Sequence, residues 1–416
     1  MTSTWTDTPG ASNLQRVMTL VLLYVALLIV LGPAVQFSQW HIGPDNNQAA
    51  AEAMAWLDGR LDLPSRGGDV ALYKDHFYNV FPPLWTLICF AVYAMNSLVF
   101  GEPLVFWTVL FNIVLAGPVP LAFYWAFRRS GAGTLWAPVL AFGAIAGTAL
   151  WPVAAMLAGT RTAWIYSIQL IMAQTGLAIL LADVLGRRRF WLGGLGILIA
   201  AWSRQTCVAY ALPLLWLAWR SPHRKNALIR AGIPLVITLA IPMTLNYAKF
   251  DSPLETGYRY IFDDPNRVDA DPVRGPDGSV DIFAWRYLPS HAYHMWLSLP
   301  TEIDLTPCGL AIQGHGKGTA VWFGTPLILL VLVAFRQWWA DPRRRALMLG
   351  TIPVIFGTLL YHGPTIGQAG YYRYALDFLP IWLVVIAPWT DGPKRRWFTL
   401  ACLAWSVLYF YMIVGR

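Results

Sequence analysis

Charged residues are scarce in this chain of 416 residues. Asp, Glu, Lys and Arg together make up 12% of the sequence, while apolar residues make up 57%. An ordinary soluble domain carries roughly 25% charged residues, so the composition excludes that class. Several apolar runs exceed the roughly 18 residues that a helix needs to cross a bilayer. We therefore predict an all-α polytopic membrane protein, with a single integral membrane domain over residues 1–416.

Cysteine is also rare, and repeats are absent. The four cysteines (Cys89, Cys207, Cys308 and Cys402) show no CxxC or other ligand spacing. This excludes a disulfide framework and a thiolate metal site. No internal repeat is visible, which weakens the case for an inverted-repeat transporter. The net charge of +8 does not indicate a nucleic-acid surface, because the basic residues fall in short clusters between apolar runs.

These basic clusters predict the topology. Arg16 precedes the first apolar run, and further clusters lie at 128–129, 187–189, 220–230, 336–345 and 394–396. Basic loops remain in the cytoplasm, so we expect a cytoplasmic N-terminus in a plasma (bacterial inner) membrane. Nine full spans follow, at about residues 17–37, 103–127, 132–152, 163–185, 229–247, 320–337, 346–362, 372–389 and 397–414.

Two further segments are not ordinary spans. Residues 190–219 have basic clusters at both ends and are interrupted at Ser203-Arg204-Gln205. They predict a re-entrant helix hairpin with Arg204 at its apex, which brings the count to about 11 transmembrane segments. Residues 80–100 must begin and end outside if the cluster at 128–129 is inside. We expect them to form a helix in the outer leaflet.

Two large segments are expected to face outward. The first, residues 38–79, carries six acidic residues and is expected to contain juxtamembrane helices. The second, residues 248–318, is too long for an ordinary connection and too rich in aromatics for disorder. We predict that it forms a lid over a membrane-embedded site.

Asp45 has two interpretations. It stands three residues before Gln48 at the start of an alanine-rich stretch, a spacing typical of a capping box for a helix over about 46–58. A carboxylate fixed outside but close to the lipid surface is also well placed to act as a general base. The two roles do not exclude each other.

Five motifs are distributed over most of the chain. They are Asp45 followed by a helix, Lys74-Asp75 with Pro82-Pro83-Leu84, Ser203-Arg204-Gln205-Thr206, the segment from Asn246 to Tyr258, and the segment from Tyr371 to Pro380. In this order they resemble the motifs of the GT-C glycosyltransferases, in particular bacterial polyprenyl-phosphate-sugar-dependent transferases similar to protein O-mannosyltransferases and aminoarabinose transferases.

The resemblance implies an inverting glycosyltransferase that moves a sugar from a polyprenyl phosphate to an acceptor hydroxyl at the outer face. Asp45 would be the general base, and basic residues would hold the developing phosphate dianion. The acceptor would be a glycan, a lipid or a protein. No cofactor or metal is indicated, although a divalent cation is compatible with the acidic loop. The expected donor-binding residues are Lys74, Asp75, His76, Tyr78, Arg161, Arg204, Tyr258, Arg373 and Asp377.

Each assignment has an alternative. Arg373 and Asp377 are spaced to neutralise each other, Arg161 is placed to snorkel to the interface, and Lys74 is suited to a solvated loop. Asp75 and His76 would suit a metal only with a third ligand, which the spacing does not indicate. The alternative function is a transporter or flippase for lipid-linked sugars. Such a protein would concentrate its polar residues near the bilayer midplane.

Overall fold

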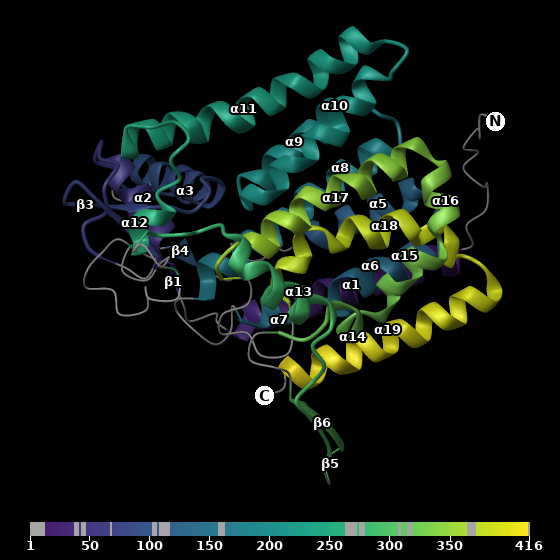
Figure 1. The fold of residues 1–416 in the computed structure, drawn as a ribbon. Coiled ribbons are helices and arrows are strands. Elements are labelled where there is room, and N and C mark those ends of the chain that lie inside the picture. The colour runs from purple at the N-terminus through teal and green to yellow at the C-terminus, as the bar shows by residue number, and fades with distance from the viewer. Residues whose placement is uncertain are drawn as a thin grey trace.

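The computed structural model describes residues 13–36, 41–42, 47–66, 69–101, 106–107, 117–156, 163–262, 273, 279–306, 309–313, 318–363 and 372–414. Over these residues the chain is mainly helical, with three small antiparallel strand pairs (Figure 1). Among the described helices, three are long and apolar enough to cross a membrane: α8 (Ala163–Leu185), α11 (Arg224–Phe250) and α19 (Pro393–Val414). The expectation of a helical membrane protein is confirmed in this coarse form.

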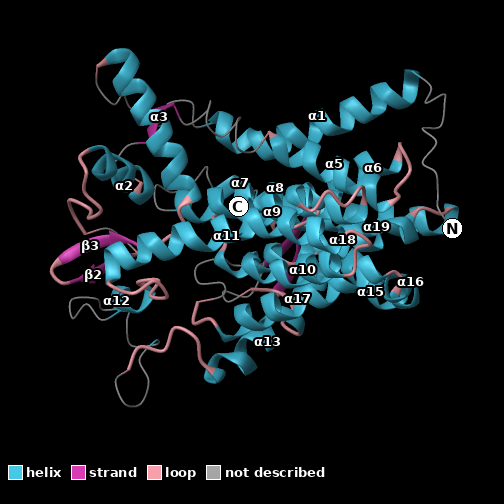
Figure 2. Ribbon diagram, turned by 90° about the horizontal axis from the view of Figure 1, so that it is seen from above, coloured by secondary structure: helices cyan, strands magenta, loops and turns pink. Residues whose placement is uncertain are grey.

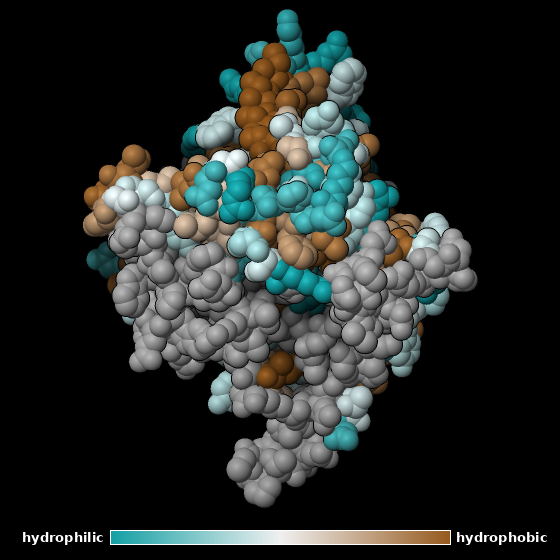
Figure 3. All heavy atoms as spheres, turned by 90° about the vertical axis from the view of Figure 1, so that its left-hand side faces the viewer, coloured by the Kyte–Doolittle hydropathy of each residue, from teal (hydrophilic) through white to brown (hydrophobic). Residues whose placement is uncertain are grey.

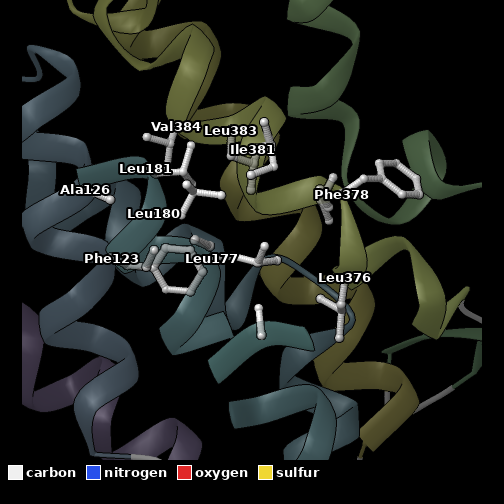
Figure 4. Packing of buried hydrophobic residues seen from close by; sticks show 14 of the residues in the cluster. Phe123, Ala126, Leu177, Leu180, Leu181, Leu376, Phe378, Ile381, Leu383 and Val384 are labelled. Carbon is white, nitrogen blue, oxygen red and sulfur yellow. The ribbon is translucent and has the colours of Figure 1, made fainter. Parts of the chain in front are cut away.

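The core forms around α8, which is apolar on all sides and therefore suited to burial. It packs against α5 (Pro118–Ser130), α9 (Trp191–Ala201) and α18 (Leu379–Thr390). Figure 4 shows side chains of α5, α8 and α18 meeting at Phe123, Leu177, Leu180, Ile381 and Val384, all of them buried. These contacts fix the position of α8, whose N-terminal half contributes to the candidate site.

Some predicted spans are interrupted. Residues 132–152 form α6 (Trp136–Ala146) and α7 (Leu150–Met156), separated by a turn. Residues 320–337 form α14 (Val321–Gly324), η4 (Pro326–Leu329), α15 (Leu330–Val333) and the start of α16 (Phe335–Ala340). Pro326 has no N–H to donate, which explains one of these breaks. By contrast, α1 (Asn13–Gln36) and α17 (Pro342–Leu360) are continuous.

Two other predicted spans begin without an α-helix. In the span predicted at 103–127, Phe106–Trp107 form β4 and pair with β1 (His41–Ile42), while α5 starts only at Pro118. In the span predicted at 372–389, a 3₁₀ helix, η5 (Arg373–Asp377), precedes α18. The predicted eleven segments are therefore not eleven continuous helices in the described residues.

The segment 190–219 contains two short helices. Helix α9 ends at Ala201, and a 3₁₀ helix, η1 (Gln205–Tyr210), leads directly into α10 (Ala211–Trp219). Arg204 occupies the extended residue between them, with φ −140° and ψ 103°. The break therefore places a guanidinium between two apolar helices.

The first predicted outer loop is not only helical. It contains α2 (Gln48–Leu57), and it also contains a hairpin of β2 (Val70–Tyr73) and β3 (His76–Asn79). The register pairs Val70 with Asn79 and Tyr73 with His76. Helix α3 (Leu84–Phe100) follows, and α12 (Tyr258–Phe262) packs on β2 at the same end of the molecule (Figure 2).

The second predicted outer segment contains several short elements within its described residues. After α12 it contains η3 (Trp285–Tyr287), α13 (Leu288–Trp296) and the strand pair β5 (Glu302–Thr306) and β6 (Gly309–Gln313). The connections α10–α11, α16–α17 and α18–α19, whose sequences carry basic clusters, lie at the other end of the helices (Figure 1). There Arg344 donates to the carbonyl oxygens of Ser130 (2.7 Å) and Val385 (2.5 Å), and Asp391 accepts from Gly133 N at 2.9 Å.

Helices α8 and α9 approach closely at two glycines, and this contact generates a prediction. A Cβ at Gly196 would lie 2.6 Å from Gly176 O and 2.7 Å from Leu180 N, both backbone atoms. Gly196→Ala is therefore expected to cost about 1–3 kcal/mol of unfolding free energy by overpacking. The control is Gly232→Ala in α11, where a Cβ meets nothing within 4 Å. Thermal unfolding in detergent should show a lower midpoint for Gly196→Ala alone, and equal midpoints would contradict the close contact.

Candidate functional site

A cavity of about 130 Å³ lies where the segment that leads into α3 meets the other helices. Its wall is formed by the β2–α3 region, α8, the break after α9, the start of α12 and the end of α17. Figure 3 faces this end of the molecule and shows hydrophilic side chains gathered across it beside apolar ones. The lining residues are Asp69, Phe81, Pro82, Gln169, Ser203, Arg204, Gln205, Thr206, Thr256, Tyr258, Phe283, Thr358, Tyr361 and Tyr374.

Arg204 supplies the positive charge of this cavity. Its Nε and Nη2 donate to the carboxylate of Asp377 at 3.1 and 2.9 Å, and its guanidinium lies 4.4 Å from the ring centroid of Tyr374. The side chain is 20% exposed. Within the described part of the chain Nη1 makes no hydrogen bond, so its protons are available to an anion in the cavity.

Asp377 orients Arg204 from behind. Its carboxylate is fully buried and also accepts from Thr206 Oγ1 at 2.7 Å, while its backbone oxygen accepts from Tyr210 OH at 2.8 Å. The alternative in which Arg373 neutralises Asp377 is therefore wrong. Asp377 pairs with Arg204, whereas Arg373 is buried and donates from Nη2 to Tyr374 OH at 3.0 Å. Both arginines flank the ring of Tyr374.

Three tyrosines form an aromatic wall. The ring centroids of Tyr258 and Tyr361 are 6.4 Å apart, and those of Tyr361 and Tyr374 are 6.1 Å apart. Burial raises the pKa of Tyr258; Arg204 lowers it, while Tyr374 and Asp69 raise it further. Tyr258 therefore remains a neutral hydroxyl at ordinary pH, able to donate a hydrogen bond.

Lys74 and Asp75 lie away from the cavity. They form the two-residue turn between β2 and β3, with φ of 49° and 64°, as a type I′ hairpin turn requires. Lys74 is exposed and contacts Asp251 at 2.5 Å, and Tyr73 OH donates to the same carboxylate at 3.0 Å. These two hydrogen bonds lower the pKa of Asp251. Lys74 joins the hairpin to the end of α11 and does not line the cavity, and its contact with a phosphate stays a prediction.

His76 and Tyr78 are also outside the cavity. His76 Nδ1 lies 3.4 Å from an oxygen of Asp62, and both side chains reach solvent. Tyr78 packs edge-on against Phe250, with ring centroids 5.5 Å apart. Burial raises the pKa of Tyr78. The described residues bring no group of three His, Cys, Asp or Glu side chains together as a metal site.

Two predicted site residues, Asp45 and Arg161, lie outside the described residues. The structure nevertheless corrects one role proposed for Asp45. Helix α2 begins at Gln48, and its cap is Asn47, whose side-chain oxygen accepts from Ala49 N (3.0 Å) and Ala50 N (3.1 Å). The capping box predicted for Asp45 is therefore wrong.

A buried ion pair next to the cavity was not predicted. Lys249, at the end of α11, contacts the carboxylate of Glu52 in α2, and both side chains are almost fully buried. Asn79 Nδ2 and Thr86 Oγ1 each donate to Glu52 Oε2 at 2.6 Å, and Lys249 Nζ donates to Asn79 O at 3.0 Å. The cluster ties α2 and the end of β3 to α11. Its sequence signal was a single acid within an alanine-rich helix and a lysine ending an apolar helix.

Of the predicted site residues, the structure brings Arg204 and Tyr258 to the cavity wall and Asp377 directly behind it. The cavity also contains residues that were not predicted. Among them are Asp69, Gln169, Tyr361 and Tyr374. Tyr374 lay within a quoted motif, but nothing in the sequence pairs Asp69 or Gln169 with Arg204, because they come from separate segments.

Comparison with models of known protein families, with curated proteins and with solved structures finds no match to this chain.

The buried pair generates a prediction about stability. Lys249→Met leaves the Glu52 carboxylate buried without its cation, and we expect a loss of about 3–5 kcal/mol. The double variant Glu52→Gln/Lys249→Met removes both charges and should recover part of that loss. Lys74→Met, which breaks the exposed pair with Asp251, is the control and should barely change the unfolding midpoint. A Lys249→Met protein as stable as wild type would contradict the coupling.

Proposed function

We propose that this chain is an inverting glycosyltransferase that takes its sugar from a polyprenyl phosphate at the outer membrane face. The observation that carries the proposal is the guanidinium of Arg204, which lines a cavity between apolar helices and the segment that leads into α3. Placing a charged arginine among apolar helices is energetically unfavourable, and such residues usually mark a functional site. A lipid-linked phosphate has the matching chemistry, with an anion at the end of an apolar chain.

The chemistry of the cavity supports transfer at a phosphate. Asp377 cancels part of the charge of Arg204 but fixes its plane, so the arginine acts through directed hydrogen bonds rather than net charge. A cavity of about 130 Å³ is smaller than the ~300–1,000 Å³ typical of a whole-ligand pocket. It suits the reacting groups, while the prenyl chain remains in the lipid.

A transferase also needs a group to take the proton of the acceptor hydroxyl. Among the residues that line the cavity, Asp69 carries the one carboxylate. Its position is fixed because β2 begins at the next residue, and Val70 pairs with Asn79 of the buried cluster. We propose that Asp69 takes this proton. The same role stays a prediction for Asp45.

In this reaction the acceptor oxygen bonds to the anomeric carbon as the bond from that carbon to the phosphate oxygen breaks. The electron pair leaves with polyprenyl phosphate, whose growing charge Arg204 accommodates. The proton passes from the acceptor hydroxyl to the carboxylate. Because this is a single displacement, the configuration at the anomeric carbon inverts.

The phosphate role predicts the behaviour of a double variant. Arg204→Gln/Asp377→Asn removes both charges together, so no buried charge is left unpaired. We expect the protein to accumulate normally but to lose sugar transfer about 10²–10³-fold, as when an oxyanion-stabilising donor is removed. The assay is transfer of labelled mannose, glucose or aminoarabinose from undecaprenyl phosphate in membrane vesicles.

Arg259→Gln is the matched control for this variant. Arg259 is half exposed, pairs with Glu255 and is not part of the cavity wall, so transfer should persist. Full activity in the double variant would contradict the phosphate role. Movement of the lipid-linked sugars across the vesicle membrane without transfer would favour the transporter.

The carboxylate role predicts a difference between acidic residues of one loop. Asp69→Asn should lower transfer about 10²–10⁴-fold, the range for loss of a general base. Asp75→Asn, at the exposed hairpin turn, should leave transfer unchanged. Asp45→Asn is measured in parallel. If Asp45→Asn loses sugar transfer while Asp69→Asn keeps it, the general base is Asp45 and the role proposed for Asp69 is wrong.

A further inference from the structure

Gln169, in the second turn of α8, carries a polar group with no use in the fold. The side chain is 3% exposed and lines the cavity. Within the described part of the chain its Nε2 has no hydrogen-bond partner. Burying an amide donor without a partner destabilises the folded protein, so a purely structural side chain at this position would be apolar.

A neighbouring glutamine on the same helix shows how such a donor is satisfied. Gln174 is also buried, and its Nε2 donates to Leu170 O at 3.2 Å and to Leu376 O at 3.1 Å. The first of these bonds, to the carbonyl four residues earlier, is a contact that a helical glutamine can make within its own helix. Gln169 Nε2 does not make this bond, although the side chain of Gln169 is part of the cavity wall.

We infer that Gln169 is a substrate-binding residue whose Nε2 donates a hydrogen bond to an oxygen of the lipid-linked sugar phosphate in the cavity. The inference rests on the proposed function and adds a recognition residue to it. Gln169 and Arg204 line the same cavity, so a ligand held by the Nη1 of Arg204 lies within a small volume that Gln169 also faces.

The bond that Gln169 makes requires an acceptor atom on the ligand. Both the phosphate and the hydroxyls of the sugar carry such oxygens. An amide donor is uncharged, so it adds direction without adding to the positive charge of Arg204. In this arrangement the ligand accepts a hydrogen bond from a donor that the fold leaves without a partner. Ligand binding therefore offsets the free-energy cost of burying that donor.

The test is Gln169→Met, which keeps the length of the side chain and removes its polar atoms. We expect the ligand-free variant to unfold at the same or a higher temperature than wild type, because a buried unsatisfied donor is gone. We expect the dissociation constant for undecaprenyl phosphate, or for its mannose, glucose or aminoarabinose conjugate, to rise roughly tenfold or more, and sugar transfer to fall to match. Weaker binding of the free phosphate places the bond on the phosphate, whereas weaker binding of the conjugates alone places it on the sugar.

Gln174→Met is the matched control, because it removes a donor that is satisfied and should lower the unfolding temperature. A Gln169→Met protein that binds and transfers like wild type would overturn the inference and leave the proposed function intact. A lowered unfolding temperature in Gln169→Met would also overturn it, since the side chain would then be structural. If wild type neither binds undecaprenyl phosphate nor transfers sugar, the proposed function falls and the inference falls with it.

Discussion

The pairing of Arg204 with Asp377 is the interaction on which the site depends. Arg204 stands at a break between two apolar helices and Asp377 stands at the end of η5, so the pair joins residues that are 173 positions apart. Two charges in an apolar interior are tolerated only when each is matched and hydrogen-bonded. Thr206 and Arg204 together supply that matching for the Asp377 carboxylate, and the same geometry directs the guanidinium into the cavity.

A second buried pair lies near another part of the wall. Glu52 and Lys249 tie α2 to the end of α11, and Asn79 links them to the strand that precedes Phe81 and Pro82. The two pairs therefore position different parts of one cavity wall. The first joins the break after α9 to η5, and the second joins α2 and the β2–β3 hairpin to α11. Between these fixed walls, Gln169 and Asp69 face a space that the protein itself does not fill.

The sequence predicted the parts of this protein that depend on local pattern. The helical membrane class follows from apolar runs, and the break that exposes Arg204 follows from three polar residues between them. The pairing of Arg204 with Asp377 did not follow. Spacing suggested Arg373 as the partner, because a pattern reports neighbours on one helix and not contacts between distant segments. The hairpin at 70–79 and the cap at Asn47 were missed for a related reason, since several polar residues competed for each role.

The least buried of the long helices, α11, has a consequence beyond packing. Its 27 residues extend about 40 Å, which matches a bilayer with its headgroups, roughly 40–45 Å, rather than the hydrocarbon core alone. Arg224 and Arg230 mark one end of the helix, and Lys249, held by Glu52, marks the other. A thinner bilayer would tilt α11 and shift the end that carries Lys249. A change in lipid thickness would therefore act on the Glu52–Lys249 pair, and through it on the position of α2 near the cavity.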